Sequence, residues 1–285
     1  MNKQKRVMAI HDISCVGRCS LTVALPIISA AGHDCGVLPT AVLSTHTGGF
    51  TDFTYRDLTA DINPISAHWQ TLGLCFDAMY SGFLGSFEQI DLVEELFRTY
   101  KTDDNLVLVD PVMADEGKLY SIFSPEMVKG MAKLCASADI IIPNITEACF
   151  MVDEAYKHGP YDKPYIENLL KKLAELGPKQ VVLTGVHFDS DKLGAAIYNA
   201  AENKIEYVFA SRIEGHFHGT GDVFGSSLLS AFLNDFTLTD AAQIACDYVC
   251  ECIRATIELG QERRYGVAFE RALPMFVKQL GLMTD

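Results

Sequence analysis

The sequence predicts an α/β fold in which a mainly parallel central sheet is flanked by helices. Short apolar runs alternate along the chain with longer segments of helical apolar spacing, which is typical of parallel strands joined by crossover helices. The runs at residues 106–109 and 140–142 are wholly apolar, as expected of strands that are covered on both faces. No linker rich in Pro, Gly or Ser divides the 285 residues, so we expect a single domain over residues 1–285.

Each predicted strand is a short apolar run that ends at a polar residue, Gly or Pro. In chain order these runs are residues 6–10, 34–38, 78–80, 106–109, 140–142 and 180–183. Residues 194–198 and 205–209 flank Glu202-Asn203 and predict a hairpin. The polar, Gly-containing segments between elements predict loops, at residues 11–17, 44–54, 81–85 and 110–124.

Each predicted helix has apolar residues three or four positions apart. Pro125 suits the first turn of its helix, and Gly32 follows the end of the first helix in the chain. The predicted helices are residues 20–31, 64–72, 89–100, 125–135, 145–152, 165–176, 220–234, 239–259 and 267–280.

The composition is that of a globular chain, with 49% hydrophobic and 21% charged residues. A net charge of −14 argues against a broad nucleic-acid-binding surface, which needs clustered Lys and Arg. The chain has neither a run of 18 apolar residues nor a signal peptide, so we expect a cytoplasmic protein without a membrane partner. Its nine Cys are then expected to be reduced, with Cys246 and Cys250 in the core on one helix face.

Ligands of such folds bind outside the carboxyl ends of the parallel strands. The polar residues at the predicted strand ends are therefore candidates for a site. They are Asp12, Ser81, Asp110, Asn144, Glu147 and Thr184.

The strongest local motif is Gly219-Thr220-Gly221-Asp222, which opens a long predicted helix. Two glycines let a ligand approach the backbone closely, and the N–H groups of a first helical turn attract an anion. Asp222 lies in the same turn, where a carboxylate repels a phosphate. It is therefore either a base for an attacking hydroxyl or only a favourable charge at the helix end. The motif matches neither the P-loop nor the G-x-G-x-x-G pattern.

This motif resembles the G-[TA]-G-D helix start of the ribokinase superfamily. Four more segments resemble those of its pyridoxal kinases, and all five occur in family order over most of the chain. They are Ser44-Thr45-His46-Thr47-Gly48, Ser81-Gly82-Phe83-Leu84-Gly85-Ser86, Asp110-Pro111-Val112-Met113 and Pro143-Asn144-Ile145-Thr146-Glu147. Hydroxymethylpyrimidine kinases are the nearest relatives of that branch.

The resemblance implies a three-layer ribokinase-like fold and a small-molecule kinase. The reaction would be ATP-dependent phosphorylation of the 5′-hydroxyl of pyridoxal, pyridoxine or pyridoxamine, which salvages pyridoxal 5′-phosphate. Asp222 would be the general base. The N–H groups of Gly219, Thr220 and Gly221 would stabilise charge on the transferring phosphoryl group.

The same resemblance implies roles for the strand-end residues. Asp110 and Glu147, with Asn144, would organise Mg²⁺ near the nucleotide phosphates, and carboxylates are ligands that Mg²⁺ prefers. Thr184 would contact those phosphates. Members of the family often also need a monovalent cation such as K⁺, and they are usually homodimers.

The substrate pocket implied by the resemblance contains His46 and Thr47 against the pyridine ring, with Asp12 and Phe83 on the same wall. Asp12 stands where better-known pyridoxal kinases have Ser, and Phe83 replaces their Tyr. Phe83 keeps an aromatic face but loses a hydroxyl. These two departures affect which vitamer is expected and leave the phosphotransfer unchanged.

Three alternatives remain open on the sequence. The chain is a kinase of hydroxymethylpyrimidine or another small alcohol, or a binding protein for vitamin B6 or a nucleotide without catalysis, or a nicotinamide-dependent dehydrogenase. The retention of Asp222 argues against a binding protein. The single Gly in residues 11–17 argues against a dehydrogenase, which has a glycine-rich turn after its first strand.

Overall fold

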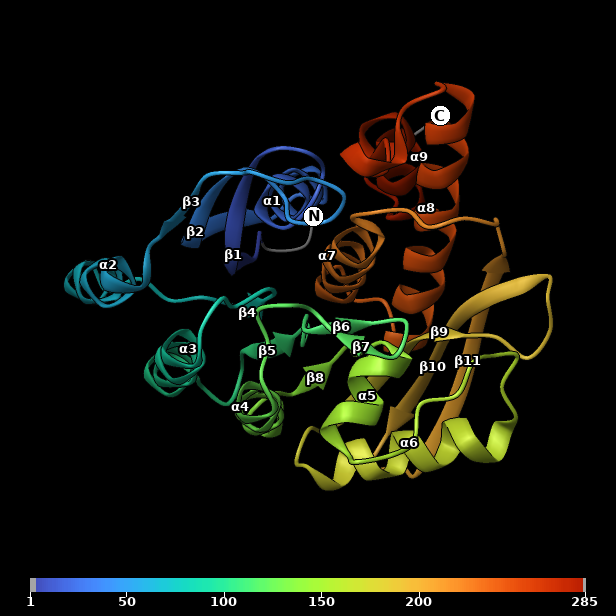
Figure 1. Cartoon of the computed structure of the whole chain (residues 1–285). Coiled ribbons are helices and arrows are strands. Elements are labelled where there is room, and N and C mark those ends of the chain that lie inside the picture. Colours follow the sequence, from blue (N-terminus) through green and yellow to red (C-terminus); the bar gives the residue numbers. More distant parts are fainter. Residues whose placement is uncertain (1–3, 284–285) are drawn as a thin grey trace. The chain divides into compact units, whose positions relative to one another are not determined.

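The computed structural model describes residues 4–283, which form two compact units. Unit 1 joins the start of the chain, up to Asp77, to its end from Ile213 onwards, and unit 2 is Ala78–Arg212. Unit 2 is therefore continuous in sequence, whereas unit 1 is assembled from two distant segments. Figure 1 shows this as blue to cyan and orange to red elements in unit 1, and as green to golden elements in unit 2.

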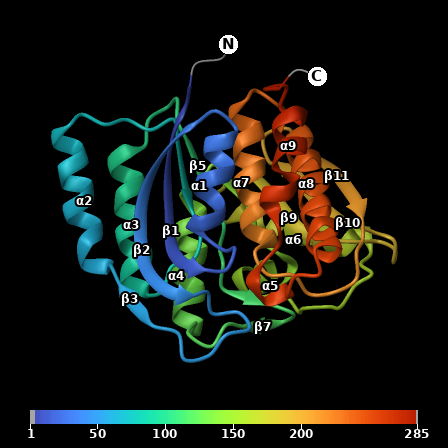
Figure 2. The ribbon, with the colours of Figure 1, turned by 90° about the horizontal axis from the view of Figure 1, so that it is seen from above.

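The strands of unit 1 are β1 (Arg6–Val16), β2 (Asp34–Thr45) and β3 (Tyr55–Asp57). β1 and β2 run parallel and are joined by α1 (Leu21–Ala30), while β3 is antiparallel to β2. The remaining helices are α2 (Thr59–Thr71), α7 (Thr220–Leu233), α8 (Leu238–Glu258), the short 3₁₀ helix Arg263–Tyr265 and α9 (Phe269–Gln279). α1 packs on α7, α7 on α8 and α8 on α9, so the two chain segments share one helical layer (Figure 2).

The strands of unit 2 lie in the order β11-β10-β9-β8-β5-β4. They are β4 (Ala78–Ser81), β5 (Leu106–Val109), β8 (Ile140–Ile141), β9 (Gln180–Val186), β10 (Lys192–Asn199) and β11 (Lys204–Ser211). Strands β4, β5, β8 and β9 run parallel, and β10 and β11 form an antiparallel hairpin. The helices are α3 (Phe87–Tyr100), α4 (Pro125–Ala136), α5 (Ile145–Met151) and α6 (Lys163–Glu175). A small hairpin pairs β6 (Ala114–Asp115) with β7 (Lys118–Leu119).

Local chemistry explains where several helices begin. The side chains of Ser86, Ser124, Asp162 and Thr237 each accept a hydrogen bond from a backbone N–H in the first turn of α3, α4, α6 and α8. Such N-caps satisfy donors that a helix leaves without partners. The strands β4, β5 and β8 are almost wholly buried, as expected of parallel strands that helices cover.

The predicted α/β class is confirmed: mostly parallel strands are flanked by helices. The predicted strand over 106–109 and the hairpin around Glu202-Asn203 are confirmed. The predicted loop at residues 11–17 is wrong for most of its length, because β1 continues to Val16 along β2. No helix within residues 4–283 has the length and apolar character needed to cross a membrane.

Candidate active site

Helix α7 begins at a glycine turn that leaves its first turn uncrowded. Gly219, which precedes the helix, has a φ of 77°, a left-handed value that favours glycine. A Cβ at this position would also collide with the backbone oxygen of Arg18. A Cβ at Gly221 would meet no described atom within 4 Å beyond its chain neighbours and the backbone of its own helical turn. The start of α7 therefore has space for a ligand beside backbone N–H groups that attract anions.

Two carboxylates, Asp12 and Asp222, interact electrostatically at this turn. Burial raises the pKa of Asp222 to about 7, and the negative charge of Asp12 adds to the shift. Burial also raises the pKa of Asp12, while hydrogen bonds from the hydroxyls of Ser20 and Ser14 oppose that rise. A carboxylate that titrates near neutral pH can accept a proton from a substrate hydroxyl. This pair is therefore the strongest acid–base feature of unit 1.

The prediction that Asp12 follows the end of the first strand is wrong. Asp12 lies inside β1 and is only 4% exposed. β1 extends beyond it because β2 is also longer than predicted, so that Ser14 pairs with Leu43 and Val16 with Thr45. The register shifts between His11 and Ile13, next to Asp12. Irregular pairing of this kind often reorients a side chain near a site.

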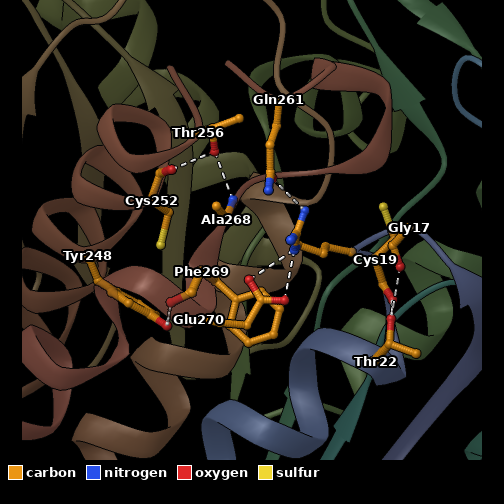
Figure 3. A network of polar contacts seen from close by, with 11 residues as sticks. Gly17, Cys19, Thr22, Tyr248, Cys252, Thr256, Gln261, Ala268, Phe269 and Glu270 are labelled. Atoms are coloured by element: carbon orange, nitrogen blue, oxygen red, sulfur yellow. Dashed lines mark hydrogen bonds and ion pairs between the residues drawn. The ribbon is translucent and has the colours of Figure 1, made fainter. Parts of the chain in front are cut away.

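The segment from Gly17 to Thr22 spans the connection between β1 and α1 and the start of α1, and it is held by several hydrogen bonds (Figure 3). The Arg18 guanidinium donates to both carboxylate oxygens of Glu270 at 2.8 and 2.9 Å, and to the side-chain oxygen of Gln261 at 3.1 Å. The Thr22 hydroxyl lies 3.2 Å from the carbonyl of Gly17 and 2.9 Å from that of Cys19.

Ser20 belongs to the same segment, and its side chain and backbone lower the pKa of Asp12 and of Asp222 respectively, against the effect of burial. The sequence analysis missed Arg18 and Ser20. No local pattern marks them, because their partners are far away in the sequence.

His46, predicted to touch the substrate ring, uses both of its ring nitrogens inside the protein. Nε2 lies 2.6 Å from the carbonyl oxygen of Arg264, and Nδ1 accepts the N–H of Gly48 at 3.2 Å. These two partners require the tautomer with the proton on Nε2. Burial also lowers the pKa of His46, which favours the neutral ring. The neighbouring Thr47 is exposed.

A second cluster, in unit 2, is built around the start of α5. The Asn144 side chain accepts the N–H of Glu147 at 2.9 Å, and Glu147 accepts the N–H of Asn144 at 2.8 Å. The pair is therefore a capping box. Glu147 also accepts the N–H of Met113 at 3.1 Å, and the Asn144 side chain donates to the carbonyl of Ala114 at 2.8 Å. Both residues thus tie α5 to the segment that follows β5.

Burial raises the pKa of Glu147 to about 8, and the charge of Asp115 adds to this rise. The hydrogen bonds from three backbone N–H groups oppose the shift. Asp110 is buried at the end of β5 and lies near the same region. Both it and Glu147 are close enough to Cys135 that their charges, together with burial, raise the pKa of the Cys135 thiol. A nearby cation would favour the ionised form of Glu147.

Thr184 lies next to Asn144 in a parallel bridge. Its hydroxyl is 3.3 Å from the carbonyl oxygen of Pro143, which also accepts the N–H of Thr184 at 2.9 Å. Thr184 was expected just after a strand, but β9 continues to Val186.

Phe83 is half-buried against Phe123, with ring centroids 6.1 Å apart.

The unit 2 cluster has the chemistry of a partial cation site. In the described part of the chain, no group of three or more His, Cys, Asp or Glu side chains is arranged to hold a metal ion. Asp110 and Glu147 could supply two carboxylates, and Mg²⁺ characteristically takes its other ligands from water and phosphate. The residues therefore fit Mg²⁺ bound together with a nucleotide better than a cation held by protein alone.

Comparison with known proteins agrees with this chemistry. A hydroxymethylpyrimidine/phosphomethylpyrimidine kinase of Aquifex aeolicus is 29% identical over 184 residues, which cover 63% of this chain and 68% of that protein. A Bacteroides thetaiotaomicron protein, provisionally named a phosphomethylpyrimidine kinase and crystallised with pyridoxal, is 37% identical, with a TM-score of 0.91 over 96% of each chain. The pyridoxal kinase of Lactobacillus plantarum is 29% identical, with a TM-score of 0.89 over 99% of this chain and 100% of that one.

The family model of the phosphomethylpyrimidine kinases matches residues 29–266, which include the Gly-rich turn, Asp222 and the whole unit 2 cluster. The family match and the relatives together show that the chain is an enzyme that transfers a phosphoryl group to an alcohol. The chain belongs to the phosphomethylpyrimidine kinase family, within the ribokinase superfamily that also contains the pyridoxal kinases.

Proposed function

We propose that this kinase transfers the γ-phosphoryl group of ATP to the 5′-hydroxyl of a vitamin B6 compound. The observation that carries the proposal is Asp222, which has a pKa of about 7 in the first turn of α7 beside an open glycine turn. The pyridoxal in the Bacteroides thetaiotaomicron structure and the name of the Lactobacillus plantarum relative support the choice of substrate.

In the proposed reaction the substrate oxygen forms a bond to the γ-phosphorus while the bond from that phosphorus to the oxygen of ADP breaks. Asp222 accepts the proton of the hydroxyl. The N–H groups of Gly219, Thr220 and Gly221 donate to the phosphoryl oxygens, where charge develops. Because such a transfer involves little covalent chemistry by the protein, its rate depends on position and charge neutralisation.

The substrate ring is proposed to contact Asp12, His46 and Thr47 of unit 1. Asp12 would accept a hydrogen bond from a ring substituent. His46 would present its ring face, since both of its nitrogens are already bonded to Arg264 and Gly48.

The cluster of unit 2 is proposed to serve the nucleotide. Asp110 and Glu147 would hold Mg²⁺, which neutralises phosphate charge, and Asn144 would keep Glu147 in place through the capping box. Thr184 would donate to a phosphate. The resemblance further implies a K⁺ requirement and a homodimer, which activity with and without K⁺ and light scattering respectively would test.

The test is an ATP-consumption assay with pyridoxal, pyridoxine, pyridoxamine and hydroxymethylpyrimidine, each with Mg²⁺ and with or without K⁺. We expect kcat/KM for one B6 compound to exceed that for the pyrimidine at least tenfold, a difference of about 1.4 kcal/mol. Binding of pyridoxal without turnover on any substrate would instead favour a binding protein.

Hydroxymethylpyrimidine is the second candidate substrate. The match to the phosphomethylpyrimidine kinase model and the Aquifex aeolicus relative favour it. Both candidates are aromatic nitrogen rings that carry a hydroxymethyl group, so the same base and the same anion site would serve either. Higher kcat/KM for the pyrimidine in the same assay would decide for this alternative.

A further inference from the structure

The backbone of Arg18 lies between two glycines that come from other parts of the chain. Gly219 precedes α7 and Gly266 follows the 3₁₀ helix, and both have a left-handed φ, of 77° and 83°. A Cβ on Gly219 would collide with the carbonyl oxygen of Arg18, and a Cβ on Gly266 would lie 2.6 Å from the same oxygen. Only residues without a side chain therefore let both segments close on Arg18.

Backbone hydrogen bonds join these three segments to one another. The N–H of Arg18 donates to the carbonyl of Tyr265 at 2.9 Å, and the N–H of Val267 donates to the carbonyl of His218 at 3.2 Å. The connection after β1 is thus bonded to the end of the 3₁₀ helix, and the residues that follow this helix are bonded to the turn before α7. The position of that turn depends on all three segments.

The side chain of Arg18 binds two more residues near the end of the chain (Figure 3). Its Nε–H is shared between the two carboxylate oxygens of Glu270, at 2.8 and 2.9 Å, and Nη1 donates to the side-chain oxygen of Gln261 at 3.1 Å. The planar guanidinium therefore binds in two directions at once. A lysine ammonium would keep the charge without this geometry.

The start of α9, which carries the carboxylate partner of the arginine, is itself fixed by α8. The N–H of Ala268 donates to the hydroxyl of Thr256 at 2.8 Å, and the hydroxyl of Tyr248 donates to the carbonyl of Phe269 at 3.0 Å (Figure 3). Thr256 and Tyr248 are both buried. The arginine is thus anchored to a part of unit 1 that buried hydrogen bonds hold in place.

We propose that Arg18 is a positioning residue that holds the glycine turn of α7 in place for phosphoryl transfer, with its carbonyl against Gly219 and its side chain anchored to Glu270 and Gln261. The proposal rests on the proposed function, which assigns this turn to the transferring phosphoryl group. N–H groups of a first helical turn stabilise such a group only when they are held in the right geometry.

The effect of the side chain is expected to be local. The Glu270 side chain is 51% exposed, and ion pairs with exposed partners contribute little to global stability. Removal of the pair should therefore let the Arg18 segment and the glycine turn open more often, without unfolding the protein.

The experiment compares Arg18→Ala and Glu270→Ala with the wild-type protein by hydrogen exchange, measured by NMR at two amides. The N–H of Val267 joins two of the segments, and the N–H of Val223 donates to the carbonyl of Gly219 at 3.0 Å, so both amides report opening of the turn. We expect exchange at both to become at least about tenfold faster in each variant, with little change in Tm.

Two controls separate the ion pair from the mere loss of an arginine. Arg6, at the start of β1, also donates to a carboxylate, that of Asp34 at 2.6 Å, and Arg6→Ala should leave both amides unchanged. The double variant Arg18→Glu with Glu270→Arg reverses the pair, and the amide of Gln261 can donate to the new carboxylate. It should restore most of the protection that the single variants lose.

Kinetics connect the turn to the reaction. With the preferred substrate, kcat should fall about tenfold in Arg18→Ala, while KM for that substrate changes less than twofold. Unchanged exchange at both amides in Arg18→Ala would overturn the positioning role, and faster exchange with unchanged kcat would overturn its link to the reaction.

The two proposals fail in different ways. If the wild-type enzyme phosphorylates none of the four substrates, hydrogen exchange still decides whether Arg18 holds the turn, and the proposed function fails instead. If Arg18→Ala does not fold, Glu270→Ala and Gln261→Ala remove the same side-chain hydrogen bonds from the other side and decide by the same criteria.

Discussion

Asp222 lies where its charge is unfavourable, and this environment suits its proposed role as a base. Burial and the neighbouring Asp12 raise its pKa to about 7. A base with such a pKa binds a proton more strongly than an ordinary carboxylate does, and it is still largely ionised slightly above neutral pH. At the residue scale, the activity should therefore depend on the protonation state of this one group.

We predict that kcat/KM falls about tenfold for each pH unit below pH 7, because the protonated base cannot accept the substrate proton. Asp222→Asn should remove this dependence and lower kcat by about 10²–10⁴-fold, with ATP binding almost unchanged. Steady-state kinetics from pH 5 to 9 and calorimetric titration with ATP measure both effects. Near wild-type turnover by the variant would exclude Asp222 as the base.

The same pKa predicts how stability varies with pH. Asp222 has a higher pKa in the folded protein than in the unfolded chain, so the folded state binds more protons between about pH 4 and pH 7. Its contribution to the free energy of unfolding is therefore lost as pH rises through that window, by at most about 4 kcal/mol. Asp222→Asn should have a Tm that declines less between pH 5 and pH 8 than that of the wild type. Equal declines in a thermal-melt series would contradict the shift.

Sequence reasoning located Asp222 and Glu147 because each belongs to a local motif with a known chemical purpose. It could not predict that Glu147 binds the backbone of Met113, a contact across 34 positions. Ser20 escaped notice for a similar reason, since no local pattern shows that it influences the pKa of Asp12 and of Asp222. Local patterns indicate which groups are present, and tertiary contacts determine their ionisation.

At the scale of elements, the glycine turn before α7 contains two glycines with different functions. Gly219 is needed for its left-handed φ and its closeness to Arg18. Gly221 has open space around it instead. The fold thus requires Gly219, whereas the space around Gly221 is left open for the proposed ligand.

This difference predicts opposite results for two similar variants. Gly219→Ala should lower the free energy of unfolding by more than about 1 kcal/mol, because alanine is strained at this φ and its Cβ collides with the Arg18 backbone. Gly221→Ala should keep wild-type stability but raise KM for ATP or lower kcat, since the new methyl group occupies the ligand space. Denaturant titration and kinetics separate the two. A destabilised Gly221→Ala would show that the turn needs both glycines.

The extent of elements was less predictable than their existence. β5 matched its prediction because an apolar run between polar residues determines both ends. α2 was expected from Pro64, a residue that favours a first turn, but it begins at Thr59. Pro64 cannot donate to the carbonyl of Ala60, and this carbonyl belongs to an exposed residue that water can reach. β3 was not predicted, since its three residues are exposed and pair only with β2.

At the scale of the whole molecule, the proposed tasks are divided between the two units. Unit 1 contains Asp12 and Asp222, whereas unit 2 contains Asp110 and Glu147. The first pair is assigned to substrate and proton transfer, and the second to the cation and nucleotide. Substitutions in the two units should therefore change different kinetic parameters.

We predict that Asp12→Ser changes the ratio of kcat/KM values among the B6 compounds by about tenfold without altering the Mg²⁺ concentration needed for half-maximal activity. Glu147→Gln should raise that Mg²⁺ concentration and leave the ratio unchanged. In the double variant, the fold-losses of kcat/KM seen in the two single variants should multiply, because independent effects on the activation free energy add. Circular dichroism controls for folding. An unchanged ratio in Asp12→Ser would mean that Asp12 does not contact the substrate.

The discontinuity of unit 1 has a consequence for how the protein is made. During translation, Ala78–Arg212 leaves the ribosome as a continuous stretch and can begin folding while later codons are still being read. The Gly17–Thr22 segment emerges much earlier than Glu270 and Gln261, the residues that bind Arg18. The first strands of unit 1 therefore have to wait for α7, α8 and α9 to emerge, and the contacts around the proposed base form only after unit 2 has been synthesised.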